Sequence, residues 1–136
     1  MTDHLAAATA GGDAALARAR ELQVRIAVVV LDRAMAVTAV QRMDGAYPST
    51  FEVARAKAHT ALNFGAPTSA LAERIVPANQ AALQGVVPQL MFVPGGVPIR
   101  VDGAVVGAVG VSGATAAQDH DCAEAAAARM SAALAG

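Results

Sequence analysis

A tight-turn signal near the C-terminus constrains the fold more than any other feature of the sequence. Asp102-Gly103 stands between two apolar runs, Val97–Val101 and Ala104–Val111. A two-residue hairpin turn of type I′ requires positive φ at both central residues, and Asp and Gly tolerate that conformation. The two runs are therefore predicted to pair as antiparallel strands.

The rest of the chain predicts elements that continue this antiparallel plan. A nearly continuous β-branched run precedes the turn Asp32-Arg33-Ala34, and a second apolar segment follows it, which indicates two more strands. The expected strands are Val24–Leu31, Ala36–Gln41, Gln89–Val93 and the two strands of the hairpin. The expected helices are Leu5–Leu22, the segment between Ser49 and Gly65, Thr68 to about Ile75, and the segment after Thr115, with 78–88 as a short helix or a loop.

Two pairs of residues have the spacing of a capping box, in which the two side chains cap a helix reciprocally. They are Ser49 with Glu52, and Thr115 with Gln118. The order of helix, two strands, helices, three strands and helix predicts an α/β fold of the α+β type. In that fold helices pack on the faces of a five-stranded antiparallel sheet, rather than in an alternating βαβ array.

Length and composition narrow the classes of function. The chain has 136 residues, enough for one hydrophobic core, so we expect a single domain over residues 1–136. Its net charge is −1, its aromatic content is 3%, and its basic residues are scattered, which argues against a nucleic-acid partner. The high apolar content of 55% with so few aromatics favours a homo-oligomer, because apolar surface is then left for another copy to cover.

Three sequence features predict the cellular compartment of the protein. No segment approaches the roughly 20 apolar residues that a membrane span needs, and the N-terminus lacks the basic-then-apolar order of a leader. Cys122 is the single cysteine, so no internal disulfide is expected. These features predict a cytoplasmic protein that does not act at a membrane.

Glycine is concentrated around the predicted hairpin. Six of the twelve glycines lie between Gly95 and Gly113. Either helix and sheet backbones approach closely there, or a ligand rests on exposed backbone amides, in which case Gly96 and Ser112 would contact it. Neither the Walker A motif nor the dinucleotide fingerprint fits this segment, and Ser112 lacks the setting of a nucleophile elbow.

An ordered set of motifs along most of the chain resembles the GlcG/HbpS family of haem-binding and haem-degrading proteins, and is also similar to the C-terminal domain of PduO. The motifs are Asp32, Arg42-Met43-Asp44-Gly45-Ala46, Ala56-Lys57-Ala58, Pro67-Thr68, Gly95 to Ile99, Asp102-Gly103, Gly107 to Ala114 and Asp119. The resemblance implies a profilin-like three-layer α/β/α domain, which often forms homo-oligomers, and it makes haem a possible cofactor.

The sequence differs from the family pattern at one turn, and it offers only one candidate for the histidine that ligates haem iron in other members. The family usually has glycine two residues after the aspartate, where this chain has Ala34. Haem-binding members use a histidine in or before the first helix as an iron ligand, and the candidate here is His4.

Polar residues at the end of the second expected strand form one candidate ligand site. Arg42 would bind a carboxylate or a haem propionate, with Asp44 and Tyr47 nearby. Alternatively, Arg42 and Asp44 pair with each other and fix the turn. Lys57 would assist in binding the ligand, or would simply be solvated on the surface of its helix.

His59 is a second candidate group, on a helix face that it shares with Glu52 and Arg55. It would lie at the surface or in an interface, or it would ligate iron or act as a general acid or base. Asp119-His120-Asp121-Cys122 contains metal-binding residue types, but consecutive helical residues point in different directions. We therefore expect its acidic residues to complement the helix dipole.

Three functions are consistent with these residues. The first is a small-ligand-binding protein for haem or another planar carboxylated ligand, with His4 or His59 as the iron ligand. The second is a cofactor-free lyase or isomerase for a small aromatic or oxo-acid substrate, with His59 or Asp44 as base and Arg42 as anchor. The third is a non-catalytic accessory protein of a metabolic operon.

Overall fold

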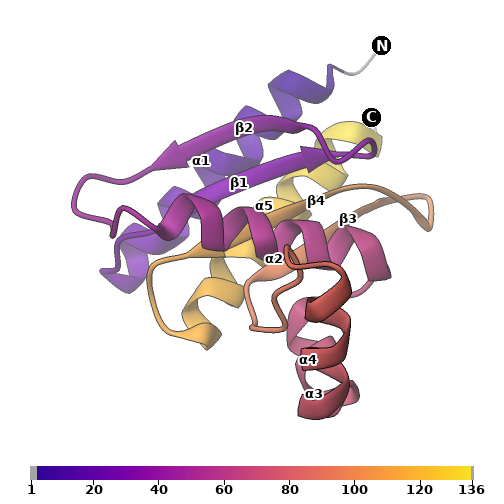
Figure 1. Cartoon of the computed structure of the whole chain (residues 1–136). Coiled ribbons are helices and arrows are strands. Elements are labelled where there is room, and N and C mark those ends of the chain that lie inside the picture. Colours follow the sequence, from indigo (N-terminus) through magenta and orange to yellow (C-terminus); the bar gives the residue numbers. More distant parts are fainter. Residues whose placement is uncertain (1–2, 136) are drawn as a thin grey trace.

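The computed structural model describes residues 3–135 and forms three layers, with a sheet between two layers of helices (Figure 1). Within that range the elements are α1 (His4–Leu22), β1 (Ala27–Asp32), β2 (Val37–Arg42), α2 (Thr50–Phe64), α3 (Thr68–Arg74), α4 (Pro77–Val86), β3 (Gly96–Val101), β4 (Ala104–Ser112) and α5 (Ala116–Ala135).

The strands form one antiparallel sheet in the order β2-β1-β4-β3. The predicted hairpin is confirmed, because β3 pairs with β4 and the turn has φ of 51° at Asp102 and 80° at Gly103. β1 lies inside the sheet, and its first five residues are buried, as expected from their continuous apolar pattern.

The expectation of a fifth strand was wrong, since the described residues contain four strands and Gln89–Val93 is a loop. Met91 N donates a hydrogen bond to Thr60 Oγ1 at 2.8 Å, and the Leu90 carbonyl accepts one from Gln84 Nε2 at 3.1 Å. The segment is rich in apolar residues because Leu90 and Phe92 are buried in a small cluster with Leu71. Helix side chains therefore satisfy the backbone of this segment in place of a neighbouring strand.

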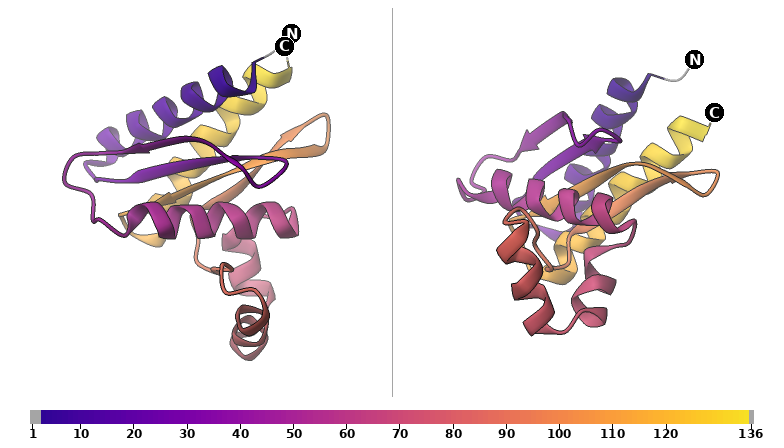
Figure 2. Two further views of the ribbon diagram at one scale, coloured as in Figure 1. Left: turned by 45° about the horizontal axis from the view of Figure 1, so that its top comes forward. Right: turned by 45° about the vertical axis from the view of Figure 1, so that its right-hand side comes forward.

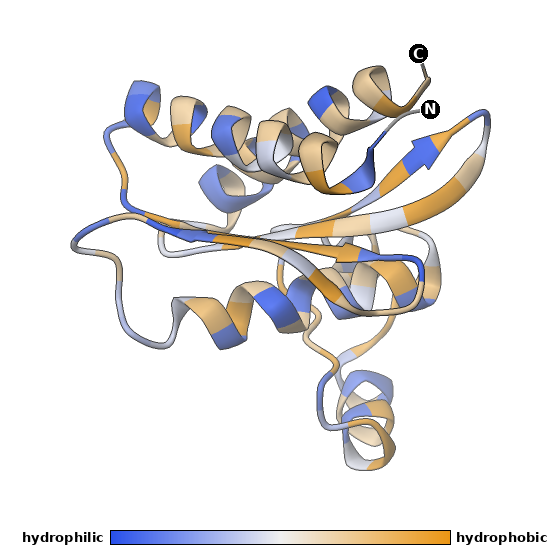
Figure 3. Cartoon of the chain, turned by 90° about the horizontal axis from the view of Figure 1, so that it is seen from above, coloured by the Kyte–Doolittle hydropathy of each residue, from blue (hydrophilic) through white to orange (hydrophobic). Residues whose placement is uncertain are grey.

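The two faces of the sheet are covered by different helices. α1 and α5 lie side by side on one face, and α2 lies on the other (Figure 2). The strands lie between the helical layers, and most of their length is coloured as hydrophobic (Figure 3). Most core residues lie on the α1/α5 side, and a smaller core on the α2 side contains Val29, Leu31, Ala54, Ala58, Ala61 and Ala108.

One glycine shows why this region of the sequence is rich in that residue. A Cβ added to Gly110 would lie 1.8 Å from the carbonyl oxygen of Ala54 on α2. The β4 backbone and α2 are therefore in direct contact, which agrees with the packing explanation of the glycine cluster.

The two predicted capping boxes differ in outcome. At α5, Gln118 N donates to Thr115 Oγ1 at 3.2 Å and Thr115 N donates to Gln118 Oε1 at 3.2 Å, so this box is confirmed. At α2, Ser49 already has helical backbone angles, and its side chain makes no capping hydrogen bond among the described residues. Thr50 Oγ1 instead donates to the Tyr47 carbonyl at 2.7 Å.

α3 and α4 project from the body of the molecule as an arm (Figure 1). The uncertain segment 78–88 is largely helical, because α4 begins at Pro77, where proline suits a first helical turn. In the described chain, α4 has no buried residue. No helix within residues 3–135 is both long enough and apolar enough to cross a membrane.

Candidate functional site

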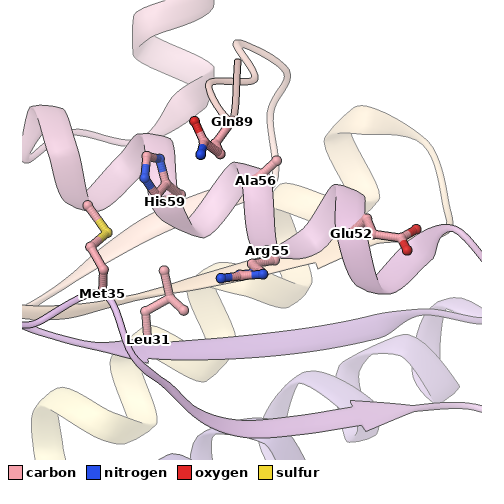
Figure 4. A pocket seen from close by; sticks show the side chains of 7 residues that line it. All are labelled: Leu31, Met35, Glu52, Arg55, Ala56, His59 and Gln89. Atoms are coloured by element: carbon pink, nitrogen blue, oxygen red, sulfur yellow. The ribbon is translucent and has the colours of Figure 1, made fainter. Parts of the chain in front are cut away.

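A hollow of about 400 Å³ lies between α2, the β1–β2 turn and the loop that follows α4 (Figure 4). We call it the α2 pocket. Its lining residues are Leu31, Met35, Glu52, Arg55, Ala56, His59 and Gln89. The pocket thus combines one imidazole, one guanidinium, one carboxylate and an apolar floor.

His59 projects from α2 into this pocket and is partly buried. Burial lowers the pKa of His59 below its usual value, and the positive charge of Arg55 lowers it further. The neutral imidazole is therefore favoured near neutral pH, and that is the form that accepts a proton or binds a metal ion.

Asn63, one turn further along α2, orients the imidazole. Its Nδ2 lies 3.2 Å from His59 Nδ1. With Asn63 donating to Nδ1, the proton of the neutral ring is on Nε2, which then donates to a ligand. With the amide turned over, its oxygen accepts from Nδ1–H and the Nε2 lone pair is available to a metal ion.

Charged groups lie beside His59 because α2 brings residues three and four positions apart onto one face. Arg55 and Glu52 are both exposed, and both line the pocket. Within residues 3–135, Arg55 has no carboxylate partner at salt-bridge distance. Its guanidinium is therefore available to an anionic ligand group.

Lys57, Gly96 and Ser112 gather at a different place, next to the start of α5. Lys57 is buried, contrary to the expectation of a solvated side chain, and its Nζ donates to Asp119 Oδ2 at 3.0 Å and to the Val111 carbonyl at 3.1 Å. A Cβ on Gly96 would lie 2.2 Å from the Lys57 carbonyl oxygen. The structure therefore separates these three residues from the α2 pocket.

Asp119, the partner of Lys57, has a pKa set by opposing effects. Burial raises the pKa of the Asp119 carboxyl group, while the charge of Lys57 and the Ala114 N–H lower it. The neighbours of Asp119 bind elsewhere, since Asp121 pairs with Arg18 at 2.8 Å and His120 pairs with Glu124.

Arg42 ends β2 and Asp44 lies in the loop that follows, and neither residue lines the α2 pocket. Arg42 Nη1 donates to the Ala46 carbonyl at 2.7 Å, and the Asp44 carbonyl accepts from Arg25 Nη1 at 2.6 Å. In the described part of the chain the two side chains form no ion pair with each other. Two arginines that bind backbone carbonyls fix this loop, and the predicted Arg42–Asp44 pair does not.

His4 begins α1 and lines a second, more open hollow of about 630 Å³ with Asp32, Arg33 and Thr38. Thr38 Oγ1 donates to the Val30 carbonyl at 3.2 Å, so this oxygen accepts from His4 Nε2, which lies 3.3 Å away. The ring proton of neutral His4 is then on Nε2, and Nδ1 is the nitrogen left for a ligand.

Comparison with known proteins identifies the family of this chain. Residues 4–128 match the model of a family described as haem degrading protein, HbpS-like. The chain belongs to the HbpS-like family.

Three solved structures are similar to this HbpS-like chain. Klebsiella pneumoniae protein ORFY is 33% identical with a TM-score of 0.88, over 97% of this chain and 92% of that one. A doubly substituted Streptomyces reticuli HbpS is 36% identical with a TM-score of 0.84, over 94% and 86%. The complex of PduOC with haem is 30% identical with a TM-score of 0.82, over 93% and 91%.

Sequence reasoning found part of the α2 pocket of this HbpS-like chain. The helical spacing of Glu52, Arg55 and His59 was a usable signal, because it places all three on one face of α2. Met35 and Gln89 were missed, because each reaches the pocket from a loop that only the tertiary fold brings to α2.

Proposed function

We propose that the α2 pocket binds a planar ligand that carries a carboxylate, with haem as the first candidate. This proposal rests on one hollow that brings together His59, Arg55 and the apolar surface of Leu31 and Met35. Among residues 3–135, Arg55 has no carboxylate partner. Membership of the HbpS-like family and similarity to the PduOC complex with haem support the choice of ligand.

The residues present fit haem by their chemistry. Histidine is a common axial ligand of haem iron, and an arginine pairs well with a propionate. His59 would ligate the iron, Arg55 would bind a propionate, and Leu31 with Met35 would exclude water from one face. Bound haem would supply an iron centre for redox or oxygen chemistry.

The other candidate residues receive different proposed roles. Arg42 and Asp44 would shape the loop after β2, and Lys57, Gly96 and Ser112 would hold α2 against the sheet and the start of α5. His4 remains a second candidate iron ligand through Nδ1, in its own hollow.

Titration with hemin tests this proposal. The wild-type protein should give a saturable shift of the Soret band at micromolar hemin. His59→Ala should change the band position and weaken binding about tenfold or more, and Arg55→Ala should weaken binding while leaving the band position unchanged. His120→Ala is the matched control, because His120 lies on α5 and pairs with Glu124.

The outcomes separate the two histidines. Loss of the shift in His4→Ala alone would move the ligand to the hollow at the start of α1. An unchanged spectrum in the His4→Ala, His59→Ala double variant would eliminate both. No saturable shift with the wild-type protein would overturn haem binding.

The lowered pKa of His59 beside Arg55 favours one alternative, a cofactor-free lyase or isomerase. His59 would act as general base, and Arg55 would anchor the carboxylate of a small aromatic or oxo-acid substrate. Such a substrate should raise the melting temperature of the wild-type protein and not that of Arg55→Ala. If neither hemin nor a panel of such acids binds, a non-catalytic accessory role is favoured.

We also propose that the chain forms a homo-oligomer through the α3–α4 arm. Residues 64–93 contain only two charged side chains, Glu73 and Arg74. The same segment exposes five large apolar residues, namely Phe64, Val76, Leu83, Val86 and Val93. An apolar surface with so few charges is suited to burial against a similar one, as when two copies pair the same surface.

A further inference from the structure

Three residues other than glycine have positive φ within residues 3–135: Gln23 at 57°, Met35 at 66° and Asp102 at 51°. Two of them have a local reason. Gln23 is the left-handed cap that ends α1, where its N–H donates to the Ala19 and Arg20 carbonyls, and Asp102 belongs to the β3–β4 hairpin turn. Met35 has a long apolar side chain and no polar group that would favour this conformation.

The β1–β2 turn imposes this backbone conformation through Asp32. The Asp32 carboxylate accepts from Ala34 N at 2.8 Å and from Ala36 N at 3.1 Å. The Asp32 carbonyl accepts from Met35 N at 3.1 Å, and Asp32 N donates to the Ala36 carbonyl at 2.9 Å. None of these bonds uses the side chain at position 35, so glycine or asparagine would occupy the same turn with less strain.

The side chain of Met35 has a use outside the turn. It packs against the core cluster on the α2 side of the sheet and lines the α2 pocket. In Figure 4 the thioether reaches from the β1–β2 turn toward the α2 side of the pocket, where His59 projects. Strained backbone conformations cluster at ligand-binding sites, so the positive φ of Met35 beside the pocket points to a role for its side chain.

We infer that Met35 is a specificity-determining residue of the α2 pocket, whose thioether forms the wall against which a flat, conjugated ligand body packs. This inference rests on the proposed ligand-binding function. A methionine suits that wall because its sulfur is polarisable, makes favourable contacts with aromatic systems, and sits on a side chain that adapts to a flat surface. Arg55 binds the acidic group, and Met35 selects the body of the ligand.

The test uses two probes that share a flat ring system and propionates, namely hemin and metal-free protoporphyrin IX. Met35→Gly should weaken the binding of both probes about fivefold or more. Its melting temperature should stay within about 2 °C of wild type, because relief of backbone strain offsets the lost packing. Met35→Leu, which keeps an apolar wall, should retain both affinities within about twofold.

Two controls separate the contribution of the Met35 side chain from the effects of backbone strain and of iron ligation. Gln23→Gly relieves a positive φ at a residue that does not line the pocket, and should leave both affinities unchanged. His59→Ala should weaken hemin binding much more than protoporphyrin binding, since only hemin offers iron to a ligand. If Met35→Gly is too unstable to titrate, Met35→Asn replaces it, because asparagine also tolerates positive φ.

The outcomes distinguish this inference from the proposed function. Unchanged affinity of Met35→Gly for both probes would overturn the role of Met35 while leaving the binding function intact. A loss of hemin alone in Met35→Leu would show that the sulfur ligates iron and would also overturn the wall. Failure of the wild-type protein to bind either probe would overturn the proposed function, and with it this inference.

Discussion

Lys57 Nζ lies 3.0 Å from Asp119 Oδ2, and the two side chains are only 3% and 4% exposed. The ion pair joins α2 on one face of the sheet to the first turn of α5 on the other, beside the carbonyl of Val111 in β4. Gly95 makes room for it, since a Cβ there would lie 2.9 Å from Lys57 Nζ. The ion pair therefore connects α2 and α5, which cover opposite faces of the sheet and have little other contact.

Removal of one partner of this pair should destabilise the fold strongly. Lys57→Met leaves the Asp119 carboxylate buried without its cation, and the loss of a single partner from a buried pair typically costs about 3–5 kcal/mol of unfolding free energy. Urea denaturation should show this loss, and the Lys57→Met, Asp119→Leu double variant should recover part of it. A loss below about 1 kcal/mol in Lys57→Met would show that the pair is dispensable.

The same variant should change the dependence of stability on pH. Burial already raises the pKa of Asp119, and the charge of Lys57 opposes that rise. Without Lys57 the pKa of Asp119 in the folded state should rise further above its pKa in the unfolded state. Protonated Asp119 then favours the folded state, and this contribution is complete only below the unfolded-state pKa. The unfolding free energy of Lys57→Met should therefore fall as pH increases from about 4 toward the raised pKa, relative to wild type. A parallel pH profile for the two proteins would contradict this explanation.

Two glycines should respond in opposite directions to substitution by alanine. Gly110→Ala places a Cβ 1.8 Å from the Ala54 carbonyl oxygen, and a clash between backbone atoms cannot be relieved by a side-chain rotation, so we expect a loss of about 3 kcal/mol or more. Gly85→Ala meets no atom within 4 Å in a helix, and should gain about 0.5–1 kcal/mol. Chemical denaturation measures both, and a stable Gly110→Ala would refute the close contact of β4 with α2.

Local signals in the sequence predicted the parts of the fold that local interactions determine. The Asp102-Gly103 turn and the Thr115–Gln118 capping box formed as expected because their hydrogen bonds and φ angles lie within a few residues. The apolar run in Gln89–Val93 was misleading, because a loop packed under helix side chains buries apolar residues just as a strand does.

The candidate site was predicted less completely because it depends on distant parts of the chain. Lys57 was expected either to assist ligand binding or to be solvated, since nothing near it in the sequence indicates its pairing with Asp119. Met35 reaches the pocket only because the β1–β2 turn folds over α2, and a turn sequence gives no sign of that contact. Glu52, Arg55 and His59 share one face of α2 because of helical periodicity alone, so this part of the site could be predicted from the sequence.

His59 should make stability depend on pH in a defined direction. Its pKa is lowered from 6.5 by burial and by Arg55, so the folded state binds a proton less readily than the unfolded state. The stabilising contribution is complete above pH 6.5 and is lost as pH falls through the lowered pKa. Wild type should therefore lose more unfolding free energy than His59→Gln as the pH falls below 6.5. Equal losses in the two proteins would show that the environment of His59 does not disfavour its charge.

The apolar α3–α4 arm, with Glu73 and Arg74 as its two charged residues, should determine the assembly state. Val86 is 83% exposed on a helix that has no buried residue in the described chain, so it has little role in the fold of one copy. Val86→Glu should leave the melting curve of the monomeric fold nearly unchanged, but should place a carboxylate in the proposed interface, where its desolvation is unfavourable. Light scattering after gel filtration should show a smaller assembly mass. Ala17→Glu adds the same charge on an exposed position of α1 and should leave the mass unchanged. An assembly that persists in Val86→Glu and dissociates in Ala17→Glu would place the interface on α1.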